Sequence, residues 1–180
     1  MNKNGEQMGG CIGFLKSMQR ITREIQPCKI YIVWEGGGSQ RRRKLYSEYK
    51  MGRKPEKLNR FYGDDIPDSE QNKKHQLISL LGMLKFVPVC QVYVSDCEGD
   101  DTIAHLCSGP LRGEDKIIVS SDKDMYQLLN DKTRIYSLHK KKIVTAEDIF
   151  EEFRIRTHNF AIAKAICGDS GDNVPGVKGI

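Results

Sequence analysis

The sequence predicts an α/β fold with a mainly parallel central sheet flanked by helices. Short apolar runs that are typical of buried strands alternate along the chain with segments whose apolar residues recur at helical spacing. Apolar strands that alternate with helices favour a parallel sheet, because a helix returns the chain to the starting edge of the sheet.

Helices are predicted where apolar residues return every three or four positions. Ile12, Leu15 and Met18 begin such a series, and Pro27 ends it. Thr145 and Asp148 have the spacing of a capping box, which satisfies the first free amide groups of a helix. The predicted helices span residues 11–25, 70–85, 98–107, 124–129, 145–153 and 158–167.

Strands are predicted at the apolar runs between these helices. Three glycines at 36–38 break the chain after the first strand, and residues 64–68 have the composition of a loop. Residues 134–138 and 142–144 are close enough in sequence to form a hairpin. The other predicted strands are residues 29–34, 88–95 and 116–120.

The charge of the chain is concentrated in one stretch. The 180 residues carry 29 Lys and Arg against 24 Asp and Glu, a formal charge of +5. Residues 41–62 hold nine of these cations and two Glu, so this stretch is +7 and the remainder of the chain is −2. A basic stretch on a slightly acidic body indicates a polyanionic partner and carboxylates that serve another purpose.

Several classes of protein are disfavoured. The longest apolar run, residues 30–34, is far shorter than the roughly 20 residues of a membrane helix, and the first ten residues show no secretory signal. The six cysteines form no C-x-x-C pair, so we expect reduced thiols, no zinc and a cytoplasmic location. No Ser-His-Asp or Cys-His pattern suggests covalent catalysis.

Carboxylates gather just after the predicted strands, at the sheet edge where sites are built. One carboxylate at a helix start often serves only as a cap, and this alternative stays open for each cluster. Several converging carboxylates repel one another unless cations neutralise them, and hard oxygen ligands select Mg²⁺ or Mn²⁺. The candidate carboxylates after the strands are Glu35, then Glu98, Asp100 and Asp101, then Asp122 and Asp124; a third cluster, Asp169 and Asp172, lies in the loop after the last predicted helix.

Four segments, residues 33–53, 98–106, 117–129 and 168–180, resemble the signature segments of the 5′-nuclease family in order and spacing. That family includes bacteriophage flap endonucleases, 5′–3′ exonucleases and the 5′-nuclease domain of bacterial DNA polymerase I. The resemblance implies a PIN-like core over residues 1–155 with a helical arch at 40–75. It also implies the start of a helix–three-turn–helix DNA-binding element at 156–180.

The resemblance implies two or more Mg²⁺ or Mn²⁺ ions on the acidic motifs, with Glu35 where the family usually carries Asp. Lys50 and Arg53 match the basic pair that contacts the scissile phosphate, the work expected of cations beside a phosphoryl centre. Without the resemblance, a solvated basic helix face is the alternative for both. The family's first strand, with its Asp, has no counterpart ahead of Gly9, so we expect a fragment cut at both ends.

Residues that suit DNA lie in two places. In the basic stretch, cations attract phosphate while interleaved tyrosines suit base stacking; Phe61 and Tyr62 suit stacking or a core equally. In the last segment, glycines let the backbone approach phosphate, and the resemblance implies a bound K⁺ there. These residues are Arg41, Arg42, Arg43, Lys44, Tyr46, Tyr49, Gly176, Lys178 and Gly179.

The expected protein is a monomeric 5′–3′ exonuclease or flap endonuclease that hydrolyses phosphodiesters at 5′ ends and at junctions of single strand and duplex. Its expected partner is DNA with a 5′ flap or 5′ single strand, with RNA–DNA primers as a further candidate and no membrane. The alternatives are a catalytically impaired, structure-specific DNA-binding module of the same fold and the nuclease part of a polymerase. The sequence leaves open the balance of exonuclease, flap and primer-removal activity.

Overall fold

The computed structural model describes residues 7–38, 40–51 and 70–179. Contacts divide the chain into two compact units: Met1–Ile32 with Lys54–Val92, and Val33–Arg53 with Tyr93–Ile180. All predicted site residues that the structure describes belong to the second unit. Arg53, Phe61, Tyr62 and the middle of the expected arch lie outside the described residues.

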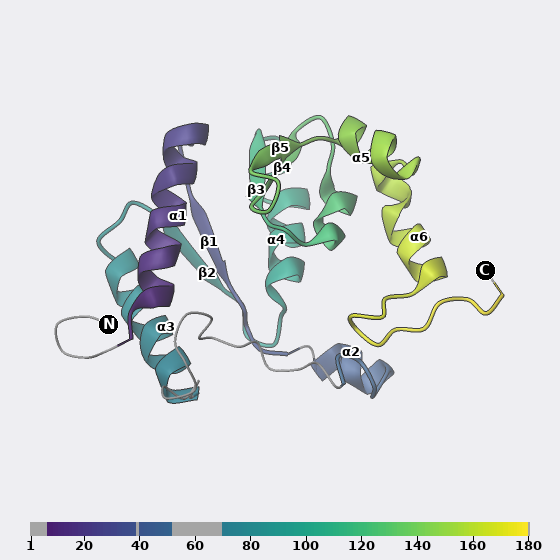
Figure 1. Cartoon of the computed structure of the whole chain (residues 1–180), viewed down its shortest axis with the longest axis horizontal. Coiled ribbons are helices and arrows are strands. Elements are labelled where there is room, and N and C mark those ends of the chain that lie inside the picture. The colour runs from purple at the N-terminus through teal and green to yellow at the C-terminus, as the bar shows by residue number, and fades with distance from the viewer. Residues whose placement is uncertain (1–6, 39, 52–69, 180) are drawn as a thin grey trace. The chain divides into compact units, whose positions relative to one another are not determined.

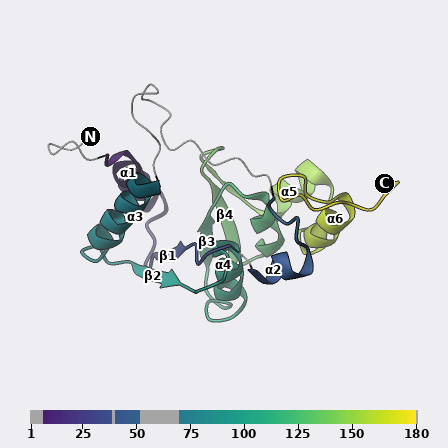
Figure 2. The same cartoon turned by 90° about the horizontal axis from the view of Figure 1, so that it is seen from below.

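The first unit is built on two helices, α1 (Gly9–Ile25) and α3 (Glu70–Leu84), which lie side by side (Figures 1 and 2). Both helices were predicted, and α1 begins two residues earlier than expected. The Gly10 amide donates to Gln76 Oε1 at 2.7 Å, and the Cys11 thiol donates to the Gln76 carbonyl at 3.0 Å. The close approach suits a glycine, because a side chain at position 10 would press on the Gln76 amide.

The strands form two small sheets among the described residues. β1 (Tyr31–Trp34) pairs with β2 (Cys90–Tyr93), and β3 (Lys116–Val119), β4 (Thr133–Ser137) and β5 (Lys142–Val144) follow in that order in the other sheet. β3 and β4 run parallel, and β4 and β5 form the predicted antiparallel hairpin. The α/β class is confirmed. The sheet is divided where one central sheet was expected, because apolar patterns locate strands but do not fix which strands pair.

An apolar core formed by described residues holds the second unit together. It joins β3, β4 and β5 to the 3₁₀ helix η1 (Lys123–Leu128), α5 (Ala146–Phe153) and α6 (Phe160–Cys167). Phe160 packs edge-on against Tyr126 and Phe153, with ring centroids 5.5 and 5.7 Å away. The core residues are Ile118, Met125, Tyr126, Leu129, Ile135, Val144, Ile149 and Phe160.

Helix ends in this unit follow the local sequence. The capping box of α5 is confirmed: the Thr145 amide donates to Asp148 Oδ2 at 2.8 Å, and the Asp148 amide donates to Thr145 Oγ1 at 3.3 Å. The helix predicted at 124–129 is η1, and the short helix η2 (Thr157–Asn159) precedes α6. α4 (Gly99–Ser108) packs against η1. None of the described helices is long and apolar enough to cross a membrane.

Candidate functional site

Glu98 is the most enclosed acid of the site. It precedes α4 in an extended conformation, and its side chain makes no capping bond to its own helix. Only 5% of the residue is exposed. Its carboxylate instead receives Lys50 Nζ at 2.8 Å, the Tyr49 hydroxyl at 3.2 Å and Arg42 Nη1 at 3.2 Å. Burial opposes its charge, yet the bonds from Lys50, Arg42 and Tyr49 outweigh it and lower the pKa of Glu98.

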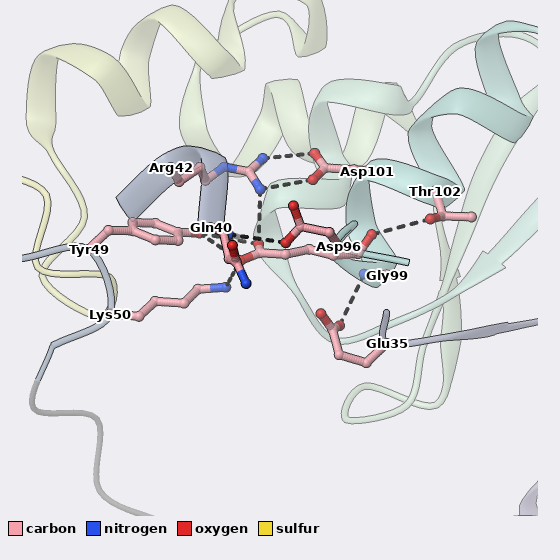
Figure 3. A network of polar contacts seen from close by, with 10 residues as sticks. Glu35, Gln40, Arg42, Tyr49, Lys50, Asp96, Gly99, Asp101 and Thr102 are labelled. Atoms are coloured by element: carbon pink, nitrogen blue, oxygen red, sulfur yellow. Dashed lines mark hydrogen bonds and ion pairs between the residues drawn. The ribbon is translucent and has the colours of Figure 1, made fainter. Parts of the chain in front are cut away.

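Arg42 anchors the basic helix α2 (Gln40–Leu45) to the start of α4 (Figure 3). Its guanidinium forms two parallel bonds to Asp101, Nη1 to Oδ2 and Nη2 to Oδ1, both at 2.8 Å. This fork geometry is the strongest arrangement that Arg and a carboxylate adopt. The bonds to Arg42 hold the pKa of Asp101 below its usual range, and Asp101 raises the pKa of Arg42.

Glu35 reaches α4 from the end of β1. Its Oε2 accepts the Gly99 amide at 3.0 Å, so a carboxylate from another segment caps a helix whose own N-cap side chain does not (Figure 3). The next residue, Gly36, lies directly against the Val94 and Cys97 carbonyls, and any side chain there would overlap the Val94 carbonyl. The Gly36 amide donates to the Cys97 carbonyl at 3.0 Å, which holds the strand end in place.

Asp100 is near enough to three other carboxylates to feel their charge, and we call these four residues, Glu35, Glu98, Asp100 and Asp122, the acidic edge. Burial raises the pKa of Asp100, and the negative charges of Asp122, Glu35 and Glu98 raise it further. These carboxylates follow three different strands, so the fold brings side chains from distant parts of the sequence close enough to repel. Such crowding is unfavourable without a cation.

A second cluster surrounds Lys164 on α6. The Lys164 ammonium contacts Asp124 and lies 2.6 Å from Asp169 Oδ2. These bonds outweigh burial and raise the pKa of Lys164, and the same ammonium lowers the pKa of Asp169. Asp122 caps η1, with its Oδ1 accepting the Asp124 amide at 2.9 Å. A pocket of about 540 Å³ lies here; its walls include Ser121, Asp122, Asp124, Phe160, Lys164, Asp169 and Ser170.

The loop after α6 is closed on itself. Asp169 and Val174 exchange two backbone bonds of 2.8 Å, and Asp169 Oδ1 accepts the Gly171 amide at 2.9 Å. Gly168 and Gly176 meet in this closure, where a side chain on either residue would overlap backbone. Gly176 is therefore required by internal packing, an explanation that differs from the predicted approach to phosphate. Gly179, at φ +91°, has open space around it, and Lys178 is exposed.

The basic stretch is used differently from the expectation. Arg42 points inward, whereas its predicted companions Arg41, Arg43 and Lys44 are exposed. Tyr49, expected to stack on bases, is 8% exposed and bonded to Glu98, because the same alternation of aromatic and basic residues also suits a buried tyrosine. Tyr46 is half-buried, and its hydroxyl donates to Glu48 Oε2 at 2.9 Å.

Two findings concern residues that the sequence left ambiguous or missed. Lys50 stands in a turn, with a left-handed φ of 57° and a side chain 20% exposed, so it is not part of a solvated helix face. Lys164 was missed. The signal was a lone lysine in an otherwise apolar helix, FAIAKAIC, just ahead of Asp169 and Asp172.

The donor chemistry of the site fits a hard divalent cation. Carboxylate oxygens are what Mg²⁺ and Mn²⁺ prefer, and the edge around Asp100 supplies them, while Asp100 itself forms no salt bridge within the described part of the chain. As the side chains stand, no three carboxylate, imidazole or thiol groups of residues 7–38, 40–51 and 70–179 are grouped closely enough to hold a metal ion. Lysine and arginine side chains occupy several of the carboxylates instead.

Comparison with known proteins gives one family. The model of the family described as "5′-3′ exonuclease, N-terminal resolvase-like domain" matches residues 1–154. The chain is 32% identical to a 5′-3′ exonuclease of Buchnera aphidicola subsp. Schizaphis graminum, over 99% of this chain and 59% of that protein. It is 33% identical to the thermostable DNA polymerase I of Thermus aquaticus, over 98% of this chain and 20% of the polymerase.

A solved structure shares the fold. The flap endonuclease of bacteriophage T5, in a pseudo-enzyme-product complex with DNA and metal ions, superimposes with a TM-score of 0.72 at 22% identity. The alignment covers 94% of this chain and 62% of the phage protein. The chain thus spans less than two thirds of the length of each of these three proteins, and it has the fold of the phage protein.

Proposed function

The chain belongs to the family of the 5′-3′ exonuclease N-terminal, resolvase-like domain, and from this premise we propose that it is the nuclease part of a metal-dependent 5′–3′ exonuclease or flap endonuclease. It would hydrolyse phosphodiesters of DNA near the junction of a 5′ single strand and a duplex. The relatives named 5′-3′ exonuclease and the phage flap endonuclease with DNA and metal ions support this substrate class.

The observation that carries the proposal is the acidic edge around Asp100 with cations beside it. Carboxylates crowded enough to raise the pKa of Asp100 favour the binding of divalent ions. Lys50 and Arg42 lie against Glu98 at the same edge. Phosphodiester hydrolysis of this kind needs carboxylates that bind metal ions and, beside them, positively charged side chains that contact the phosphate.

In this proposal the carboxylates hold Mg²⁺ or Mn²⁺ in two neighbouring places. Glu35, Glu98, Asp100 and Asp122 would hold one ion. A second ion would take its ligands from Asp101, Asp124, Asp169 and Asp172. Bound divalent ions would supply Lewis-acid stabilisation of the attacking and leaving oxygens.

The cations of the chain would orient the substrate. Lys50 Nζ, held 2.8 Å from Glu98, would donate to a non-bridging oxygen of the phosphate, with Arg53 as its expected companion. The exposed cations Arg41, Arg43 and Lys44 would gather the DNA backbone before it reaches the site. The loop at residues 168–179 would contact duplex phosphate and K⁺, as the start of a helix–three-turn–helix element.

The test is cleavage of a 5′-flap duplex with Mg²⁺ by wild type and by Asp100→Asn. We expect the substitution to lower the rate by roughly 100-fold or more, because the removed charge supports the metal, while binding in Ca²⁺ stays measurable. Asp115→Asn is the matched control, since Asp115 is exposed and, among the described residues, pairs with the equally exposed Lys132 at 3.4 Å. Cleavage by Asp100→Asn at the wild-type rate would refute the assignment.

A catalytically impaired DNA-binding module is the second candidate. One observation favours it: Glu35, where the family usually carries Asp, is bonded to the Gly99 amide. The same assay separates the two, because such a module binds the flap substrate in Ca²⁺ and leaves it uncut in Mg²⁺ or Mn²⁺.

A further inference from the structure

Two hydrogen bonds join the turn that carries Lys50 to the loop that follows α6. The side-chain amide of Asn173 donates through Nδ2 to the Glu48 carbonyl at 3.1 Å. The Lys50 backbone amide donates to the Asp172 carbonyl at 2.9 Å. These segments are more than 120 residues apart in the chain, so the link is a tertiary one.

The backbone at both ends of this link is in an uncommon conformation. Lys50 has φ 57° and Asn173 has φ 59°, the left-handed region that residues with a Cβ adopt at a cost. Asn tolerates this region well and Lys does not, so the turn at Lys50 needs support from its surroundings. The Asp172 carbonyl and the Asn173 side chain supply that support on either side of Tyr49.

The supported turn sets the direction of two side chains toward the acidic edge. Lys50 Nζ lies 2.8 Å from Glu98 Oε1, and the Tyr49 hydroxyl lies 3.2 Å from Glu98 Oε2. The side chain of Lys50 is only 20% exposed, so a rotation of its backbone would withdraw the ammonium from Glu98. The loop on the other side of the link bears two predicted metal ligands, Asp169 and Asp172.

We propose that Asn173 is a positioning residue for Lys50: its amide ties the loop that follows α6 to the turn, and so holds the ammonium where a phosphate at the acidic edge would meet it. The inference rests on the proposed function. Asn173 itself has no assigned contact with substrate or metal; it acts through the Glu48 carbonyl and the backbone of the turn.

The experiment removes the amide without straining the backbone. Asn173→Gly suits a left-handed φ, so the loop keeps its conformation while the donor to Glu48 is lost. Asn159→Ala is the control, because Asn159 is exposed and its side chain makes no capping bond at the start of α6. Each variant is measured by hydrogen exchange of the peptide around residues 46–51 in chelator, and by single-turnover cleavage of a 5′-flap duplex in Mg²⁺.

We expect Asn173→Gly to speed exchange at Lys50 and to slow cleavage by roughly 10- to 100-fold, the size of effect that small misplacements produce. Binding of the same DNA in Ca²⁺ should fall much less than the cleavage rate, since only the contact from Lys50 is loosened and the other cations of the basic stretch still attract the DNA backbone. In a Lys50→Ala background the Asn173→Gly change should cost nothing further, because the residue it positions is gone. Asn159→Ala should match wild type throughout.

Three results would overturn the inference: unchanged exchange at residues 46–51, cleavage at the wild-type rate, or a full additional loss in the Lys50→Ala background. Each of these three results would refute the positioning role of Asn173. If wild type cleaves the flap substrate, none of them would contradict the proposed nuclease function. A wild type that cuts no flap substrate in Mg²⁺ or Mn²⁺ refutes the proposed function itself, and the positioning role falls with it.

Discussion

Replacing Lys164 by Met tests whether the chain itself neutralises one of its two acidic clusters. The Lys164 ammonium contacts Asp124 and Asp169, and the three side chains are 31%, 33% and 29% exposed. Met keeps most of the apolar length of the lysine side chain and removes its charge. Without metal, the variant leaves two carboxylates near each other with no partner between them.

The magnitude follows from the number and exposure of the bonds. A buried charge-assisted hydrogen bond contributes about 1.5–3 kcal/mol, and solvent at a third exposure reduces this, so both bonds of Lys164 together amount to about 1–2 kcal/mol. For a chain of this size about 1 kcal/mol lowers the midpoint of thermal unfolding by about 2–4 °C. We therefore expect Lys164→Met to melt roughly 2–8 °C below wild type in chelator.

Mg²⁺ should then change the comparison. If Asp124 and Asp169 bind an ion, it takes over the neutralisation that Lys164 provides, and it meets no competing ammonium in the variant. Thermal melts followed by circular dichroism, in chelator and in excess Mg²⁺, measure the effect. The ion should raise the melting temperature of Lys164→Met more than that of wild type.

Two results would refute this reasoning. Equal melting of wild type and Lys164→Met in chelator would mean that the ammonium contributes nothing to stability. An equal rise with Mg²⁺ would mean that the ion does not use the carboxylates that Lys164 contacts. Lys132→Met is the control: Lys132 lies 3.4 Å from Asp115 with both side chains mostly exposed, so we expect less than about 0.5 kcal/mol.

Two other substitutions test caps near the site. Glu35→Ala should lower the free energy of unfolding by about 1 kcal/mol, because the Gly99 amide loses its acceptor. Glu35→Gln should retain most of this stability, because its amide oxygen can still accept the bond. Equal losses of stability for the two variants in urea denaturation would mean that Glu35 does not cap α4. Asp148→Asn should lower stability by roughly 0.5–1 kcal/mol at neutral pH. The Thr145 amide lowers the pKa of Asp148, so this contribution is present above the unfolded pKa and is lost as pH falls through the folded pKa. Unfolding curves at decreasing pH should therefore show the difference in free energy of unfolding between wild type and Asp148→Asn becoming smaller. A difference that stays constant in acid would contradict the role of the Asp148 carboxylate.

Local sequence patterns predicted most helices and strands of this fold, because the interactions that start and end them involve residues close together in the sequence. The capping box of α5 and the hairpin of β4 and β5 were recognised, since both depend on neighbours in sequence. The division of the strands into two sheets was not, because pairing is decided between segments far apart. The same limit applies to Gly176: its sequence context indicates a turn, but only the fold reveals the contact with Gly168.

The site divides in the same way. The sequence predicted the acidic residues from their motifs, but it did not predict their ion-pair partners. The pairs of Arg42 with Asp101 and of Lys50 with Glu98 join residues far apart in the chain, and no local pattern indicates such a pair. Tyr49 is an example. A tyrosine between basic residues is compatible with both base stacking and burial, and its hydrogen bond to Glu98 in the structure shows that it is buried. Lys164 could have been noticed as the one charged residue of the apolar helix α6. Its role becomes clear only in the fold, where α6 packs against η1.

The two acidic clusters differ in how their charge is balanced. Lys164 already neutralises part of the cluster of Asp124 and Asp169, whereas the nearest charged neighbours of Asp100 include three carboxylates. A divalent ion from solution therefore gains most at Asp100, because it relieves repulsion at a carboxylate that forms no ion pair within the described part of the chain, although its expected co-ligand Glu98 is paired with Lys50 and Arg42. An ion at the other cluster must compete with Lys164, so under the proposed function it binds more weakly. That ranking makes the metal response of Lys164→Met informative: removing the competitor should bring the affinities of the two clusters closer together.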